Sequence, residues 1–240
     1  MTLIRGRRAE RSDVDGTRPR PDRPLLTASG RSRAAALLAC CAILVTVLGV
    51  LFAHQATADW LDRAVDSPII SGLSHRHGLA FWLTVAGSPV PAAALSAMIV
   101  VACLLAGRLN GAVLAAAAVP AAAGLNDGVL KPLVHRTYLG VLTYPSGHSA
   151  TIFALAATIG VLLVRRPPLP RARALRMLIL GAACALGCVV VIGLIGLQFH
   201  YFTDTVAGAA VGIGTVCGLA LLLDRPAVRR PLAWVSHRLP

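Results

Sequence analysis

The chain has 240 residues, of which 56% are hydrophobic and only 14% are charged, and its mean hydropathy is +0.72. This composition is too apolar for an ordinary soluble domain, and it predicts a protein that lies in a lipid bilayer. The net charge of +13 by itself would also fit a polyanionic partner such as nucleic acid, so the positions of the basic residues decide its meaning.

The N-terminal segment, residues 1–33, is rich in Arg, Asp and Pro and contains almost no apolar run. A segment of this composition cannot bury enough apolar surface to fold by itself. We therefore predict a disordered, basic cytoplasmic tail that contacts anionic lipid headgroups.

Long apolar windows dominate the rest of the chain. A bilayer core about 30 Å thick needs roughly 20 apolar residues per helix. The windows predict an all-α, polytopic membrane protein, a six-transmembrane-helix bundle over residues 34–224, with a short basic cytoplasmic tail at 225–240. The predicted spans lie at about 35–54, 80–106, 111–130, 148–164, 177–197 and 200–223.

Prolines and glycines modify two of these spans. The second window contains Gly87, Pro89 and Pro91, which predict a short helix followed by a membrane span that begins near Pro91. In the last window, Gly208 and Gly212 have the small-xxx-small spacing that favours close contact between helices.

The basic residues are distributed unevenly over the predicted loops. The outer segments hold only Arg63, Arg76, Lys131 and Arg136, and all the other Lys and Arg residues fall on the inner side. This asymmetry predicts a cell-membrane protein with both termini in the cytoplasm. It also places the stretch YPSGHSA, residues 144–150, at the outer face, and it argues against nucleic acid as the partner.

His200 precedes Asp204 by four residues at the start of the last predicted span. On a helix, this spacing places the two side chains on one face, so that the carboxylate can hold one ring nitrogen and leave the other free as a base or nucleophile. A buried His–Asp pair without a catalytic role would have the same spacing. Ionisable residues at the end of a membrane helix favour the functional interpretation.

A second group of polar residues lies upstream, between two predicted spans. Lys131 and Arg136 supply positive charge, and they are followed by Ser146, Gly147 and His148 at the start of a helix. Cations, a hydroxyl group and the N–H groups of a helix start are typical of a phosphate-binding site. Asp127, one helical turn before Lys131, is expected to form an ion pair with that lysine.

These residues resemble the three signature motifs of the type 2 phosphatidic acid phosphatase (PAP2) superfamily, in the same order along the chain. The resemblance implies a phosphatase that acts on a lipid phosphate and needs neither metal nor cofactor. It further implies that His200 attacks phosphorus to form a phosphohistidine, that Asp204 orients His200, and that His148 protonates the leaving oxygen. The residues that would hold the phosphoryl oxygens are Lys131, Arg136, Ser146 and Gly147.

Two positions depart from the pattern of that family. Tyr138 stands where a second arginine is usual, and Leu194 stands six residues before His200, where another arginine is usual. Charge that develops on the phosphoryl oxygens would therefore meet fewer cations than in most members. These departures keep a catalytically impaired relative among the alternatives.

Other functions remain open at this stage. A lipid phosphotransferase would use the same residues. A membrane transporter would explain polar residues within the membrane but usually holds them near the midplane. A zinc hydrolase is less well supported, because the chain has no H-E-x-x-H motif. An intramembrane serine protease is also less well supported, because Ser146 lies at a helix start close to His148. The sequence identifies neither the lipid nor the oligomeric state.

Overall fold

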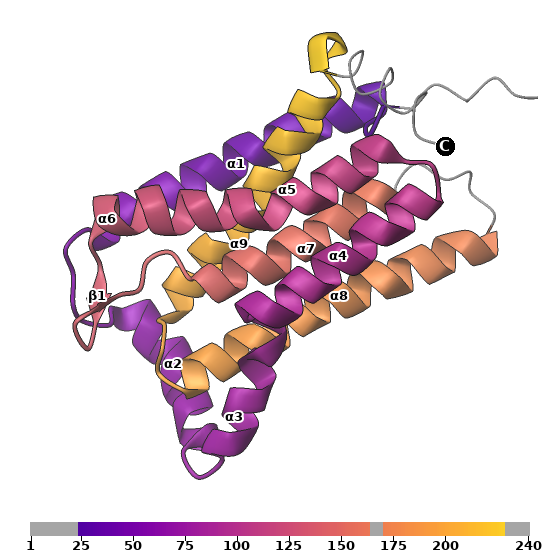
Figure 1. Cartoon of the computed structure of the whole chain (residues 1–240). Coiled ribbons are helices and arrows are strands. Elements are labelled where there is room, and N and C mark those ends of the chain that lie inside the picture. The colour runs from indigo at the N-terminus through magenta and orange to yellow at the C-terminus, as the bar shows by residue number, and fades with distance from the viewer. Residues whose placement is uncertain (1–23, 164–169, 229–240) are drawn as a thin grey trace, which may run out of the picture.

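The computed structural model describes residues 24–163 and 170–228, which form a bundle of long helices (Figure 1). A two-stranded hairpin is the only sheet in these described ranges. The elements are α1 (Ala28–Phe52), α2 (Trp60–Leu73), α3 (His77–Thr84), the 3₁₀ turn η1 (Val85–Gly87), α4 (Pro89–Leu105), α5 (Leu109–Leu125), the π-helical turn η2 (Asn126–Leu130), α6 (Lys131–Val134), β1 (Thr137–Tyr138), β2 (Val141–Leu142), α7 (Gly147–Leu163), α8 (Pro170–Gly196) and α9 (Phe202–Leu223).

The all-α class is confirmed, and the described residues contain five helical segments that are long and apolar enough to cross a membrane. The predicted fourth span, 148–164, corresponds to α7, which is apolar but has only 17 residues. The exact count of six spans is therefore not confirmed by length and composition. The five segments are Ala28–Phe52, His77–Leu105, Leu109–Val134, Arg173–Gly196 and Phe202–Leu223.

The first helix starts earlier than the predicted boundary at residue 34. The Thr27 hydroxyl accepts a hydrogen bond from the Gly30 N–H at 3.0 Å and so caps a helix that begins at Ala28. Just before it, the N–H groups of Leu25 and Leu26 donate to the carboxylate of Asp224, at 2.5 and 2.8 Å. The segment from residue 24 is thus part of the folded bundle, and the remainder of the predicted tail, 1–23, lies outside the described residues.

Helix α2 has no counterpart among the predicted elements. Its sequence contains Asp62, Asp66 and an internal proline, Pro68, so it shows no long apolar run. The carboxylate of Asp59 caps the helix by accepting the N–H groups of Leu61 and Asp62 at 2.7 and 3.0 Å. Both internal aspartates are buried, which means that α2 turns these two carboxylates toward the protein and not toward solvent.

The predicted break in the second apolar window is present. Helix α3 ends at Thr84, a 3₁₀ turn follows, and α4 begins at Pro89 with Ser88 in an extended conformation. A side chain at Gly87 would be crowded, because a Cβ there would lie 2.9 Å from the Val190 side chain and 3.2 Å from the Cβ of His148. Gly87 therefore lies against both the start of α7 and α8.

Helix α9 packs against α1 and α7 and is the most buried of the candidate spans. A Cβ at Gly208 would clash with the carbonyl oxygen of Ser146, and one at Gly212 would clash with that of Ala150. The predicted close contact through these glycines is confirmed: they let the backbones of α7 and α9 touch.

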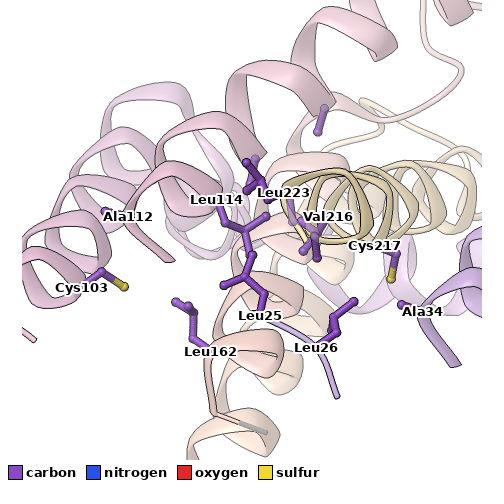
Figure 2. Close-up of a cluster of buried hydrophobic side chains, with 14 residues drawn as sticks. Leu25, Leu26, Ala34, Cys103, Ala112, Leu114, Leu162, Val216, Cys217 and Leu223 are labelled. Atoms are coloured by element: carbon purple, nitrogen blue, oxygen red, sulfur yellow. The ribbon is translucent and has the colours of Figure 1, made fainter. Parts of the chain in front are cut away.

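Two ends of the bundle can be distinguished. At one end, the buried side chains of Leu25, Leu114 and Leu223 belong to a single apolar cluster, which Figure 2 shows in close-up. At the same end, the Arg108 side chain donates a hydrogen bond to the Leu162 carbonyl at 3.2 Å. Both ends of the described chain, near residues 25 and 224, meet there. Figure 1 shows α6 and β1 at the opposite end of the long helices, with α2 and α3 beside it.

Candidate active site

A cavity of about 680 Å³ lies among the helix ends and loops near α6 and β1. Three of the predicted site side chains line it: Lys131 at the start of α6, His148 in the first turn of α7, and His200 in the loop between α8 and α9. Gly147 lines the same cavity. The fold therefore brings together residues that are up to 69 positions apart in the sequence.

The part of the cavity next to Lys131 is held by a polar network. The Lys131 ammonium group pairs with the Asp127 carboxylate at 2.9 Å, which confirms the pair expected from their spacing. The amide of Asn126 donates to Asp127 and also to the Pro145 carbonyl, both at 3.1 Å. This amide ties the turn before α6 to the loop that carries Gly147.

His200 combines a strongly lowered pKa with a buried ring nitrogen that has no partner. Its Nδ1 atom is buried and has no hydrogen-bond partner in the structure. Burial lowers the pKa of its imidazole to about 3, and the positive charges of Lys131 and His148 act in the same direction. The ring is therefore neutral at physiological pH, which is the form that can act as a nucleophile.

The predicted contact between Asp204 and His200 is not present in this structure. Tyr201 caps α9, so His200 lies before the helix and the helical i,i+4 geometry does not apply to it. The Asp204 carboxylate instead accepts the Tyr201 N–H at 3.2 Å and a hydrogen bond from Arg136 at 2.6 Å. Asp204 thus acts on the backbone next to His200 and not on the imidazole.

Arg136 is likewise placed away from the cavity, although it was predicted to bind phosphate. Its side chain is completely buried and forms ion pairs with Asp62 and Asp204, each at 2.6 Å. The guanidinium group also lies over the rings of Phe52 and Tyr201, 4.2 and 4.4 Å from their centroids. Two carboxylates compensate its charge, so the predicted phosphate contact does not fit this arrangement.

Ser146 is also fully buried, and it is not among the residues that line the cavity. Its hydroxyl oxygen accepts a long hydrogen bond from the Ser149 N–H at 3.4 Å, and its own N–H donates to the Asp204 carbonyl at 2.9 Å. Ser146 therefore connects the start of α7 to α9, while Gly147 and His148 face the cavity.

A comparison with known families gives a match in this part of the chain. Residues 131–226 match the family model of the PAP2 superfamily. The match confirms the resemblance seen in the motifs, and PAP2 superfamily members are phosphatases. Searches of curated proteins and of solved structures found no match.

The PAP2 segment begins at Lys131 and contains His148, His200 and Asp204. Two residues outside it also belong to the site region: Asp127 lines the cavity, and Asp62 holds Arg136. Sequence reasoning named Asp127 but missed Asp62. The signal that could have revealed Asp62 is a group of three aspartates, at 59, 62 and 66, in a segment between two long apolar windows.

The two positions that depart from the PAP2 pattern have different surroundings. Tyr138 lines the cavity, donates to the Gln198 side chain at 3.3 Å and packs edge-on against Tyr201. Leu194 is fully buried in α8, in an apolar cluster with Ile152 and Val190. Among the described residues that line the cavity, Lys131 is the only Lys or Arg.

Within residues 24–163 and 170–228, no group of three or more His, Cys, Asp or Glu residues is arranged to hold a metal ion. The cavity instead combines an ammonium group, two imidazoles and the start of a helix.

Proposed function

We propose that the protein is an integral-membrane phosphatase that hydrolyses a phosphomonoester or pyrophosphate of a membrane lipid through a phosphohistidine intermediate. One observation carries this proposal: a neutral, buried histidine, a second histidine and a lysine line one cavity at the end of an apolar bundle. The family match to a phosphatase superfamily supports it independently.

The proposed reaction has two steps. In the first, a ring nitrogen of His200 attacks phosphorus, a nitrogen–phosphorus bond forms, and the bond from phosphorus to the lipid oxygen breaks. His148 gives its proton to that leaving oxygen. In the second step, water attacks the phosphohistidine, His148 takes a proton from the water, and inorganic phosphate leaves as the nitrogen–phosphorus bond breaks.

The remaining roles follow from the contacts. Lys131 and the start of α7 at Gly147 are placed to bind the phosphoryl oxygens, because both lie on the cavity and both carry positive electrostatic potential. Arg136, Ser146 and Asp204, which are buried behind the cavity, hold the elements that carry the histidines. This assignment replaces the direct phosphate contacts that the motifs implied for Arg136 and Ser146.

The orientation of the protein in the membrane is part of the proposal. Arg108 and Arg225 lie toward the end of the bundle where Leu25 contacts Asp224, whereas the cavity lies at the other end. With the arginine-rich end in the cytoplasm, the cavity opens at the outer face of the cell membrane. Membrane lipids surround the bundle, and the lipid phosphate enters from the outer leaflet.

Hydrolysis is tested on purified protein in detergent with phosphatidic acid, a polyprenyl monophosphate and a polyprenyl diphosphate. We expect phosphate release that persists in EDTA and is inhibited by vanadate, together with an acid-labile phosphate on His200 detected by mass spectrometry. Transfer of the phosphoryl group to an added lipid alcohol, without phosphate release, would favour a phosphotransferase. Activity that is lost in EDTA and restored by zinc would contradict the proposed mechanism.

A further inference from the structure

Asp62 lies outside the PAP2 segment, in the first turn of α2, and its carboxylate is completely buried. Both of its oxygens are used. One accepts a charge-assisted hydrogen bond from Arg136 at 2.6 Å, and the other accepts the Thr203 N–H at 2.9 Å. A single carboxylate on α2 therefore contacts the arginine and the first turn of α9 at the same time.

From Arg136 the network continues to the backbone beside the nucleophile. The same guanidinium group donates to the Thr203 hydroxyl at 2.7 Å and to Asp204 at 2.6 Å. Asp204 in turn accepts the N–H of Tyr201, the residue that directly follows His200. Three consecutive links thus join Asp62 to the peptide next to His200.

His200 depends on this backbone for its position. It precedes α9, and its Nδ1 atom has no hydrogen-bond partner. The carboxylate that was expected to hold the imidazole is occupied by Arg136 and by the Tyr201 N–H. A hydrogen bond to the backbone of Thr143 also holds the imidazole. The orientation of the ring therefore depends on that bond and on how firmly the residues that follow His200 are fixed.

We propose that Asp62 is a positioning residue for His200, acting through Arg136 and the first turn of α9. The inference rests on the proposed function, because it assigns Asp62 a role in forming the phosphohistidine. It adds α2, a helix outside the family match, to the elements that the reaction requires.

The electrostatics explain why Asp62 in particular has this role. Arg136 is fully buried, so each lost partner leaves part of its charge uncompensated in a medium of low polarity. Without Asp62, the guanidinium group keeps only Asp204 as an ionic partner among the contacts described. Fewer contacts then fix its position against the rings of Phe52 and Tyr201. A shift that displaces Tyr201 also displaces His200, because the two residues are adjacent in the chain.

The main test compares Asp62→Asn with Asp59→Asn. An asparagine at 62 can still accept the Thr203 N–H but cannot form the ion pair with Arg136. At position 59 an asparagine still caps α2 and touches neither the arginine nor α9. Rapid mixing with p-nitrophenyl phosphate gives the rate constant of phosphoenzyme formation and, separately, the burst amplitude, which reports the fraction of active protein.

We expect Asp62→Asn to lower the rate constant of phosphoenzyme formation about 100-fold, the loss that a displacement of about 1 Å at a reacting group can cause. The burst amplitude, scaled to folded protein, should stay near the wild-type value, and Asp59→Asn should match the wild type in both quantities. A merely structural role for Asp62 would reduce the amplitude and leave the rate constant unchanged, which would overturn the inference.

A second measurement does not depend on turnover. Diethyl pyrocarbonate modifies imidazole nitrogens, and mass spectrometry of the peptide that contains His200 follows its rate at that residue alone. We expect this rate to change several-fold in Asp62→Asn and to remain unchanged in Asp59→Asn. An unchanged rate in both variants would contradict the positioning role, whether or not the protein is a phosphatase.

A milder variant covers the case in which Asp62→Asn does not fold. Thr203→Val has nearly the same shape and removes only the hydroxyl that accepts from Arg136. We expect about a 10-fold lower rate constant and an altered carbethoxylation rate at His200, and wild-type values for both would overturn the inference. If the wild-type enzyme hydrolyses substrate without forming a phosphohistidine, the proposed function is contradicted. The carbethoxylation rate of His200 in the variants then still tests whether Asp62 positions that residue.

Discussion

The N–H of Ser146 donates a hydrogen bond to the backbone carbonyl of Asp204, with 2.9 Å between the two atoms. This bond joins the residue before α7 to the first turn of α9. His148 lies two residues after Ser146, and His200 lies in the loop just before α9. One turn further along α9, Gly208 faces the carbonyl oxygen of Ser146. The relative position of the two histidines is therefore fixed by direct contact between two backbones.

Replacement of Gly208 by alanine should disturb this contact. A Cβ at Gly208 would clash with the Ser146 carbonyl, which belongs to the backbone and cannot rotate away. Overpacking of this kind typically costs about 1–3 kcal/mol, so we expect Gly208→Ala to lower both Tm and activity. In Gly181→Ala on α8, the added Cβ has open space around it, and we expect Tm to stay the same or rise slightly. Equal effects of the two substitutions on Tm would show that α7 and α9 do not touch as described.

The two histidines should respond differently to the leaving group. His200→Ala should abolish turnover of every substrate, because no phosphohistidine can form. His148→Ala should reduce hydrolysis of a lipid monophosphate by about 10²- to 10⁴-fold, the usual contribution of a positioned acid. Hydrolysis of p-nitrophenyl phosphate should fall far less, since nitrophenolate leaves without a proton. Equal losses on both substrates would mean that His148 binds phosphate and does not act as the acid.

Gly147 provides a test of the cavity wall. A Cβ at this position would lie 3.5 Å from the Asn126 amide and 3.8 Å from the Asp127 carboxylate, which are ordinary contact distances. Gly147→Ala should therefore keep the Tm of the wild type. Because the new methyl group narrows the approach of a phosphoryl group to the start of α7, we expect a higher KM for the lipid phosphate. An unchanged KM would place the phosphate elsewhere in the cavity.

Asp66 on α2 makes stability depend on pH. Burial, and then the charge of neighbouring Asp62, raise its pKa from 3.8 to about 7. The folded protein keeps this proton at pH values where the unfolded chain has lost it, so the stabilisation is complete below about 3.8 and is lost as pH rises through about 7. We expect the Tm of the wild type in detergent to fall between about pH 4 and pH 7 and to level off above that range. Asp66→Asn cannot ionise and should show a smaller fall; an identical pH dependence in the two proteins would count against this assignment.

The orientation in the membrane can be measured with single cysteines. Leu139, at the tip of the β1–β2 hairpin, is 86% exposed, and Arg225 lies near the other end of the bundle and is also exposed. In a background without the native cysteines, we expect an impermeant maleimide to label Leu139→Cys in intact cells and to label Arg225→Cys only after permeabilisation. The reverse pattern would show that the cavity faces the cytoplasm.

The sequence determined the helical class of the protein and the types of several residues that line its cavity. Long apolar windows predict membrane helices because each span must reach across the bilayer by itself, a requirement that does not depend on its neighbours. The residues Lys131, His148 and His200 could likewise be recognised by type and order, and they meet at one cavity. The pair between Asp127 and Lys131 was predictable because it lies within four residues.

Only the tertiary structure decided which polar side chains reach the cavity. Arg136 was expected there by its type, but Asp62, 74 positions earlier in the chain, and Asp204, 68 positions later, compensate its charge in a buried site. Whether Asp204 faces His200 depended on where α9 begins, and the helix begins at Phe202, two residues after His200, which is too late for that contact. The partners of Arg136 and Asp204 depend on which distant residues reach the same buried charge. A local sequence pattern does not show which residues those are.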